Sequence, residues 1–447
     1  MEHDSLIARL GLDWAKVESE VVEHLSRLVR LDTSNPPGNE IAVAEYLTAE
    51  LAGVGVPAQV LQAEPGRANL VARLSGSDRQ PPLMLLGHAD VVGANPQHWK
   101  RPPFSGEIAD GCVWGRGALD MKSQIAAGLV IVKLLRSLGL TLTRDILYVV
   151  TADEEAGSHL GAHWLWENHR SLVEADIAFN EGGGQRFETP TGPLFTVQVA
   201  EKGSARLRLT AAGSRGHASI PRTDNAIFHL ASGLVRLQSF QPDTLVSPAA
   251  RRLLGMLAEA YPDAAPAIAN LVEEPTWAKV TGLDIDPTLR EYVLAGTHNT
   301  AVPTLLSAGE RINVTPVEAS VELDCRLLPG EEPERWARVI QGVVGDRVEV
   351  TVVRGRASAP VRDDAQTLDI LGAAIAAAEP GARILPYINS ASSDARALPG
   401  VKVFGFFPSA SDVDYMRLIH GTDEHARISD LSFGTRCLFE AVLRAAT

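Results

Sequence analysis

Five residues whose side chains commonly bind metal ions are spread along this chain of 447 residues, each within its own short motif. They are His88 in LLGHADVV, Asp120 in GRGALDMK, Glu155 in TADEEAGS, Glu181 in AFNEGGG and His420 in LIHGTDEH. Imidazole and carboxylate ligands without thiolates are typical of catalytic zinc sites, in which one coordination position stays open for water. These residue types therefore predict metal-assisted hydrolysis.

Further polar residues in the same motifs have types suited to proton transfer and ligand orientation. Asp90, two residues after His88, could accept the second ring N–H of the histidine and fix its tautomer. Glu154 and Glu155 end an apolar strand, where neighbouring side chains point in opposite directions, so we expect Glu155 to bind metal and Glu154 to face the substrate and move a proton. The structural alternatives are a capping aspartate and a solvated acidic pair.

Three apolar segments that end in polar residues indicate the fold. They are PPLMLLGHAD, DILYVVTADEE and ADIAFNEGG, and in an open α/β sheet the functional crevice lies outside the carboxyl ends of such strands. Helical spacing of apolar residues accompanies them over residues 14–30, 41–55 and 122–138. The predicted fold class is therefore α/β, with a mostly parallel mixed sheet flanked by helices.

A second domain is indicated where the pattern changes near residue 200. From SARLRLTAAG to VEVTVV the order of predicted elements is strand, helix, strand, strand, helix, strand. This order predicts an inserted α+β domain of ferredoxin-like type over residues 200–356. Residues 1–199 and 357–447 would then form the domain that carries the metal ligands.

Composition narrows the class of partner and the location. The net charge of −14 and the isoelectric point near 5.4 argue against nucleic acid and anionic membrane as partners. Three widely separated cysteines predict no disulfide framework, as in a reducing cytosol. The N-terminus contains early acidic residues and the apolar stretches are short, so we expect no signal peptide, no membrane span and a cytoplasmic protein.

Taken together, the motifs resemble the zinc metallopeptidase family of the aminoacylases, carboxypeptidase S, acetylornithine deacetylase and succinyl-diaminopimelate desuccinylase. The resemblance runs from LVRLDTSNPPGNE to HGTDEHARI, and its most specific block begins at GHADVV and ends at GRGALDMK. EEAGS, the NEGG loop and EKGSARLRLTAAGSRGHASIP look most similar to the branch of carboxypeptidase S and the N-fatty-acyl-amino-acid hydrolases.

The resemblance implies two zinc ions per subunit, although Co²⁺ and Mn²⁺ also suit these ligands. His88, Asp120 and Glu181 would hold one ion. Asp120, Glu155 and His420 would hold the other, so that Asp120 bridges the two. The peptide bond after Asp120 would be cis, and Glu154 would act as general base and then as general acid.

The resemblance also implies roles for the inserted domain and for substrate binding. That domain would serve as a lid and dimerisation domain of a homodimer, and His217 in GSRGHASIPR would come from the partner subunit to stabilise the oxyanion. Arg396 in SSDARALPG would bind the substrate carboxylate through two parallel hydrogen bonds. Asn299 in THNTAVPT is a further candidate for substrate contact.

The predicted activity is hydrolysis of the amide bond of N-acyl-L-amino acids with a free carboxylate, so the partner would be such a small molecule or a short peptide. A dipeptidase or carboxypeptidase of the same family, or a deacylase like acetylornithine deacetylase, remains open. The segment 241–296 exceeds the minimal desuccinylase pattern and leaves the substrate pocket undefined. A catalytically inactive binding protein would not need all five ligands and a base, and GRGALDMK lacks the spacing of a phosphate-binding loop.

Overall fold

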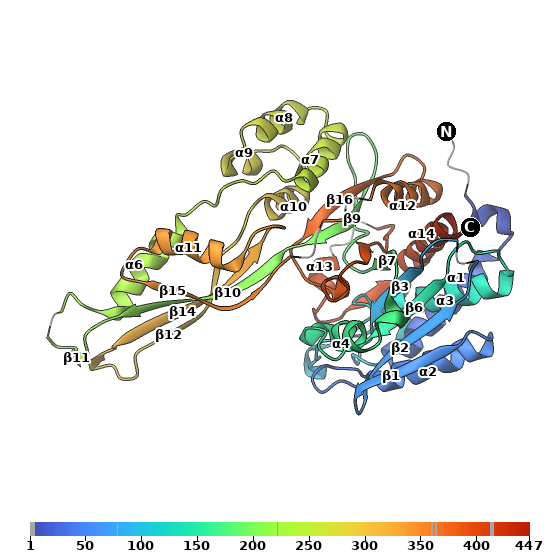
Figure 1. Ribbon diagram of the computed structural model, residues 1–447, viewed down its shortest axis with the longest axis horizontal. Helices are drawn as coiled ribbons and strands as arrows, with labels where there is room; N and C mark the ends of the chain where they lie inside the picture. The colour runs from blue at the N-terminus through green and yellow to red at the C-terminus, as the bar shows by residue number, and fades with distance from the viewer. Residues whose placement is uncertain (1–4, 78, 221, 359–360, 363, 412–414) are drawn as a thin grey trace. The chain divides into compact units, whose positions relative to one another are not determined.

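The computed structural model describes all residues except 1–4, 78, 221, 359–360, 363 and 412–414, and the chain folds as two compact units (Figure 1). The first unit consists of Met1–Val199, Arg362–Pro386 and Ser393–Thr447. The second unit consists of Ala200–Val361 and Tyr387–Ser392, so it is inserted into the sequence of the first.

The first unit is built on a nine-stranded mixed sheet with the order β1-β2-β6-β3-β7-β17-β9-β16, to which β8 adds by pairing with β9. The strands are β1 (Ala58–Glu64), β2 (Arg67–Leu74), β3 (Leu83–His88), β6 (Ile146–Thr151), β7 (Ile177–Asn180), β8 (Arg186–Phe187), β9 (Leu194–Glu201), β16 (Arg383–Asn389) and β17 (Lys402–Gly405). The ends of β9 and β16 continue into the second unit.

The prediction of a mixed sheet flanked by helices is confirmed, but its parallel part is smaller than expected. Strands β6, β3, β7 and β17 are parallel to one another, whereas β2 and β9 pair antiparallel at either side of them. The difference arises because the antiparallel pairs β1–β2 and β8–β9 extend the sheet at its flanks. Strands β3, β6 and β7 are buried along their whole length, as expected for parallel strands covered on both faces.

Helices cover both faces of this sheet. The helices and 3₁₀ turns of the first unit are η1 (Ile7–Leu10), α1 (Trp14–Val29), α2 (Glu40–Gly53), η2 (Pro96–His98), α3 (Lys122–Leu138), η3 (Glu154–Ala156), α4 (Ala162–Asn168), α5 (Arg170–Val173), α12 (Ala365–Ala378), η4 (Asp394–Ala397), α13 (Tyr415–Leu418) and α14 (Ile428–Ala446). On one face α3 packs against β3 and β6, with α1 and α14 beside it. On the other face Leu165 of α4 joins Met84 and Leu86 of β3 in one apolar core.

A small three-stranded sheet connects distant parts of the first unit. It has the order β18-β5-β4 and consists of β4 (Glu107–Ala109), β5 (Cys112–Trp114) and β18 (His425–Arg427). His425 lies opposite Trp114, and the two rings stack with their centroids 4.2 Å apart. The chain just after His420 is therefore held next to the chain just before Asp120.

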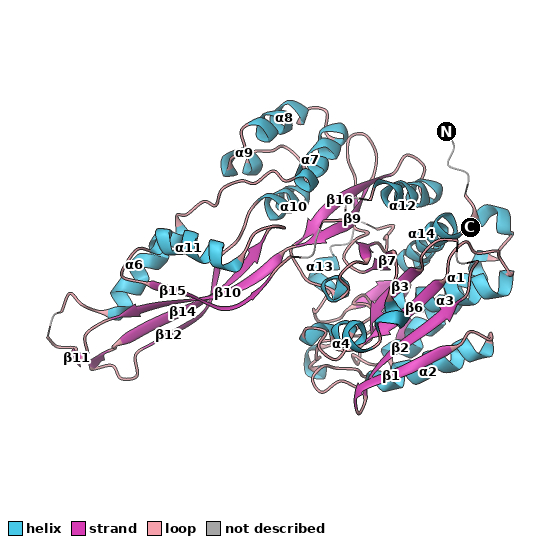
Figure 2. Ribbon diagram, in the orientation of Figure 1, coloured by secondary structure: helices cyan, strands magenta, loops and turns pink. Residues whose placement is uncertain are grey.

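The second unit contains a four-stranded antiparallel sheet with the order β12-β14-β10-β15, covered on one face by α6 and α11 (Figure 2). Its strands are β10 (Gly203–Ala212), β12 (Val302–Ala308), β14 (Glu318–Leu327) and β15 (Glu349–Arg356), its covering helices are α6 (Ala226–Gln238) and α11 (Pro333–Val344), and a separate ribbon joins β11 (Gly216–His217) to β13 (Val314–Thr315). The chain order is the strand, helix, strand, strand, helix, strand order of a ferredoxin-like sandwich. Alternation along β10 buries Leu207 and Leu209 and exposes Arg206 and Arg208, so one sheet face forms the core.

The segment 241–296, which exceeds the minimal desuccinylase pattern, forms most of a group of four helices. They are α7 (Pro248–Ala260), α8 (Ala265–Glu273), α9 (Trp277–Thr281) and α10 (Pro287–Thr297). Ser247 and Asp286 cap the first and last of these helices, each followed by proline at the first helical position. Over the part of the chain that the structure describes, no helix is long and apolar enough to cross a membrane.

Candidate metal centre

The carboxyl ends of three neighbouring parallel strands gather the polar residues of the predicted site. Strand β3 ends at His88, β6 ends just before Glu154 and Glu155, and β7 ends just before Glu181. The strand order β6-β3-β7 places these ends along one edge of the sheet. The motifs meet there because parallel strands deliver their carboxyl ends to the same edge.

Asp120 lies between the two histidines and presents one carboxylate oxygen to each. Its Oδ1 is 3.0 Å from Nε2 of His88, and its Oδ2 is 3.1 Å from Nε2 of His420. The peptide bond between Asp120 and Met121 is cis, as the resemblance implies. Glu155 Oε1 lies 3.1 Å from His420 Nε2, and Glu181 Oε1 lies 3.7 Å from His88 Nε2.

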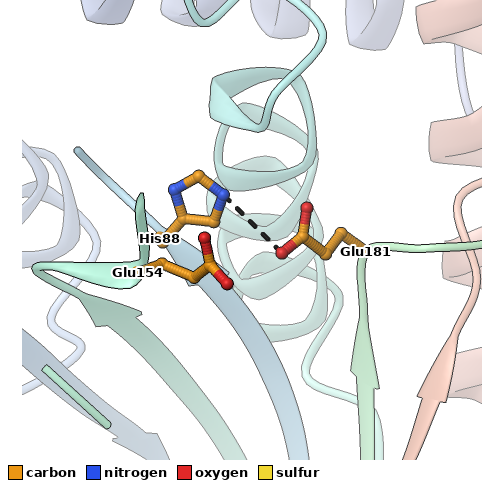
Figure 3. Close-up of side chains that lie close together, drawn as sticks. All are labelled: His88, Glu154 and Glu181. Carbon is orange, nitrogen blue, oxygen red and sulfur yellow. Dashed lines mark ion pairs between the residues drawn. The ribbon is translucent and has the colours of Figure 1, made fainter. Parts of the chain in front are cut away.

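These residues form two groups of potential ligand atoms, and within each group all the atoms lie within 4.8 Å of one another. One contains His88, Glu154 and Glu181, and Figure 3 shows the Glu154 carboxylate pointing into the space between the other two side chains. The other contains Asp120, Glu155 and His420. Nitrogen and oxygen donors in this proportion fit zinc and similar divalent cations at catalytic sites.

The site concentrates carboxylates whose charge is costly without a cation. Burial raises the pKa of Glu181 to about 7, and burial together with the charge of Glu181 raises the pKa of Glu154 well above its usual range. Hydrogen bonds to Asp120 and Glu155 raise the pKa of His420 to about 10. Without a cation, protons on Glu181, Glu154 and His420 reduce the negative charge of the site. A bound cation would take over this role.

Asp90 has a different arrangement from the one predicted. The backbone carbonyl of Asp90 lies 3.0 Å from Nδ1 of His88, whereas its carboxylate Oδ1 lies 3.6 Å away. The carboxylate instead accepts the backbone N–H groups of Glu154 and Glu155 at 3.0 and 3.1 Å. Since a carbonyl can only accept, Nδ1 of His88 carries a proton and Nε2 is the ring nitrogen that faces Asp120.

The side chains of Glu154 and Glu155 point in different directions, but strand alternation is not the cause. Strand β6 ends at Thr151, and the two acids lie in the 3₁₀ turn η3. Asp153 has a φ of 66° and ends the extended conformation before the acids. The predicted strand geometry is therefore wrong at this point, and the turn directs Glu154 toward His88 and Glu155 toward His420.

Arg396 lies in η4 of the first unit and is half-buried. Its neighbour Asp394 is buried and accepts hydroxyl hydrogen bonds from Thr151 and Ser158, on either side of the acidic turn. These bonds place η4 at the carboxyl end of β6. Arg396 is thus on a segment fastened to the edge of the sheet that carries the ligands.

His217 and Asn299 belong to the second unit. His217 is exposed on β11, where its Nδ1 lies 2.7 Å from the Ser219 hydroxyl and accepts the Ser219 backbone N–H at 3.3 Å. Asn299 is buried, accepts the backbone N–H of Leu328 at 2.8 Å and donates to Glu331 at 3.2 Å. These bonds hold the Asn299 side chain within its own unit, and its contact with substrate stays a prediction.

Sequence reasoning missed the ion pair between Arg116 and Glu424, although both residues lie beside predicted ligands. Arg116 is in the GRGALD motif and Glu424 is in HGTDEH, and their side chains meet at 2.5 Å with almost no exposure. No periodicity could reveal a contact over such a sequence separation. A buried charge inside each motif was the available signal, because charged side chains are seldom fully buried unless paired.

Comparisons with known proteins also find metallopeptidases and related hydrolases. Residues 84–444 match the model of Peptidase family M20/M25/M40. The chain is 28% identical to the Xenopus tropicalis N-fatty-acyl-amino acid synthase/hydrolase PM20D1, over 94% of this chain and 84% of that protein. It is 29% identical to a probable carboxypeptidase S-like 2 of Dictyostelium discoideum, over 81% of this chain and 71% of that protein.

Among solved structures, the M20 family metallo-carboxypeptidase Sso-CP2 from Sulfolobus solfataricus has a similar fold. It superposes with a TM-score of 0.71 over 95% of this chain and 98% of that chain. At 18% sequence identity this similarity concerns the fold alone.

Proposed function

We propose a specific reaction for this chain, which belongs to Peptidase family M20/M25/M40 and is a hydrolytic enzyme. The reaction is hydrolysis of the amide bond of N-acyl-L-amino acids that bear a free carboxylate. The observation that carries the proposal is the convergence of His88, Asp120, Glu155, Glu181 and His420 at one sheet edge, with Glu154 beside them.

The proposed ligand sets are His88, Asp120 and Glu181 for one cation and Asp120, Glu155 and His420 for the other, with zinc as the expected metal. The two Asp120 oxygens, each near a different histidine, support a bridging role. Bound cations would lower the pKa of a water molecule and polarise the scissile carbonyl.

Glu154 is the proposed proton carrier. Its carboxylate lies with His88 and Glu181, within the first group of potential ligand atoms. A carboxylate here would take a proton from the attacking water and deliver it to the leaving amine. The backbone N–H of Glu154 donates to Asp90, which fixes the start of the turn that carries the side chain.

His217, supplied by the partner subunit of the proposed homodimer, is the proposed donor to the oxyanion that forms during attack. Because the Ser219 backbone N–H donates to Nδ1 of His217, a neutral ring carries its proton on Nε2. Nε2–H is then available to stabilise developing negative charge. We expect His217→Ala to lower kcat about 10²–10³-fold with unchanged thermal unfolding, and His98→Ala, an exposed histidine of the other unit, to leave kcat unchanged. Full activity of His217→Ala would remove His217 from the mechanism.

Arg396 is the proposed partner of the substrate carboxylate. A guanidinium binds a carboxylate through two parallel hydrogen bonds and so orients it. Its segment is fastened near the acidic turn through Asp394, Thr151 and Ser158, which supports a place beside the reacting amide. The similarity to N-fatty-acyl-amino acid synthase/hydrolase PM20D1 supports an acyl group on the other side of that amide.

A dipeptidase or carboxypeptidase reaction is the second candidate, supported by the similarity to the probable carboxypeptidase S-like 2. The test is release of free amino acid by zinc-loaded protein from N-acetyl, long-chain N-acyl and dipeptide substrates with the same C-terminal residue. Faster cleavage of the acyl compounds is expected. Faster cleavage of the dipeptides would replace the proposed function by a peptidase reaction.

A homodimer formed through the second unit is the proposed assembly. The edge strand β12 is exposed at all seven residues, including Leu305 and Leu306. Helix α6, which lies over β10 and β14, exposes Phe228 and Val235. An exposed apolar edge strand beside an apolar helix face is expected to pair with another chain.

The double variant Phe228→Glu and Leu306→Lys tests this assembly, because it introduces charge on both parts of the exposed surface. Light scattering coupled to gel filtration should give twice the chain mass for the unmodified protein and the single chain mass for the variant. A monomeric unmodified protein would contradict the proposed dimer.

A further inference from the structure

We propose that the buried ion pair between Arg116 and Glu424 positions Asp120 and His420, and thereby sets the affinity of the second cation position. The inference rests on the proposed metal site formed by Asp120, Glu155 and His420. Both residues of the pair act through these ligands and touch neither substrate nor cation, so they are positioning residues.

Glu424 holds the backbone of the loop that ends at Asp120. One carboxylate oxygen accepts the backbone N–H groups of Leu119 at 2.8 Å and Asp120 at 3.2 Å. The other accepts the N–H of Gly117 at 3.2 Å and the Arg116 guanidinium at 2.5 Å. The loop before α3 is thus held by one fully buried carboxylate.

Arg116 holds the backbone of the His420 motif in the same way. Its Nη2 donates to the carbonyl oxygens of His420 at 3.1 Å and Gly421 at 3.0 Å. Its Nη1 donates to Glu424. Each motif therefore supplies the charged residue that fixes the backbone of the other, and the ion pair joins the two.

The second cation position depends on this pair more than the first. His88 is the last residue of β3 and Glu181 follows β7 directly, so two ligands of the first position are placed by the sheet itself. Asp120 and His420 are carried by loops, and His420 has a φ of 60° and is half-exposed. Of the second position's ligands, only Glu155 belongs to a turn at a strand end.

Another buried ion pair of the first unit, between Glu440 and Arg444, provides a matched control. Glu440 is also a buried carboxylate that accepts two backbone N–H groups, from Leu6 at 2.8 Å and Ile7 at 3.0 Å, and pairs with Arg444 at 2.8 Å. Its bonds hold the N-terminal segment and no predicted ligand. Glu440→Gln therefore removes an equivalent buried charge without touching the Asp120 and His420 loops.

The experiment measures stepwise zinc affinity of the full chain by competition with a chromophoric chelator, for the unmodified protein, Glu424→Gln, Arg116→Lys and Glu440→Gln. Thermal unfolding of the metal-free proteins is measured in parallel. Glu424→Gln and Arg116→Lys should weaken the second binding step about 10–100-fold and the first step less, because Asp120 also belongs to the first proposed ligand set but His88 and Glu181 do not depend on the pair. Glu440→Gln should lower thermal stability and leave both binding steps unchanged.

Arg116→Lys keeps the charge opposite Glu424 but cannot reproduce the forked contacts to two carbonyl groups. It decides the outcome if Glu424→Gln does not fold. Unchanged zinc affinity in Arg116→Lys would overturn the proposed positioning role. The same conclusion would follow if both binding steps weakened equally and Glu440→Gln weakened them as much. Absence of two binding steps in the unmodified protein would instead contradict the proposed metal site.

Discussion

The two units bury polar side chains in different ways. In the first unit, His88, Asp120, Glu154 and Glu181 approach one another at a single sheet edge, and burial together with the interaction of their charges shifts their pKa values. In the second unit, buried Lys202 donates to the carbonyl oxygen of His298.

The buried groups of the second unit are satisfied by individual neighbours. The ring of His298 lies 2.7 Å from the Thr244 hydroxyl and 2.9 Å from the Thr297 hydroxyl. Asn299 is engaged with Leu328 and Glu331. Burial of a titratable group therefore does not by itself indicate a functional site. A functional site is indicated instead where several carboxylates converge and need a cation to balance their charge.

The sharpest test of this comparison is removal of the shared carboxylate. Asp120→Ala should lose both bound metal ions and with them all measurable hydrolysis, because Asp120 belongs to both proposed ligand sets. Metal content by mass spectrometry and amino acid release measure the two effects. Asp263→Ala, at an exposed position of the second unit, is the control. Retention of both ions by Asp120→Ala would contradict the bridging role.

Replacement of the proposed base separates metal binding from proton transfer. Glu154→Gln should keep its metal content and lower turnover about 10²–10⁴-fold, because the amide has nearly the same shape but cannot accept the proton. Glu174→Gln, an exposed acid of the same unit, should behave as the unmodified protein. Near-normal turnover of Glu154→Gln would exclude Glu154 as the base.

The pH dependence of zinc binding follows from the raised pKa values of the ligands. Zinc requires deprotonated ligands, and in the metal-free site Glu181 has a pKa of about 7 and His420 a pKa of about 10. Zinc must therefore displace protons, so affinity should rise between pH 6 and 8, by about tenfold per pH unit for each proton released. Calorimetry in buffers of different ionisation enthalpy counts those protons. Affinity that falls as the pH rises would contradict this charge distribution.

The smallest effect is expected in the second unit, where a buried histidine affects stability alone. Burial lowers the pKa of His298 to about 4, so as the pH falls below about 6.5 the unfolded chain takes up the proton first and the folded state loses stability. The full difference, reached below pH 4, is about 3 kcal/mol. Denaturant unfolding of the unmodified protein and of His298→Gln should show stabilities that converge between pH 7 and 4.5. A constant difference between them would show that His298 does not titrate in this way.

The sequence was sufficient for the features that depend on local pattern. Apolar runs that end in polar residues predicted β3, β6 and β7, and the parallel arrangement of those strands explains why their motifs meet. The apolar spacing also predicted α3 over Lys122–Leu138, which Gly139, with a φ of 60°, ends.

Features that depend on distant contacts or on special backbone conformations were not predictable in the same way. The Arg116–Glu424 pair joins two loops, and the turn at Glu154 depends on the positive φ of Asp153. The helices α7 and α10 did carry a local signal, a capping residue followed by proline, but the alanine- and proline-rich composition obscured it. Strand β12 is an exposed edge strand without alternating burial, so no two-residue period marked it.

We propose that two cations bind at the carboxyl ends of β6, β3 and β7 and share Asp120. Anomalous diffraction at the zinc edge, from crystals of the zinc-loaded protein, tests it most directly. One peak is expected among His88, Asp120 and Glu181 and a second among Asp120, Glu155 and His420. A map with no peak at these residues, or with Asp120 in contact with only one ion, would contradict it.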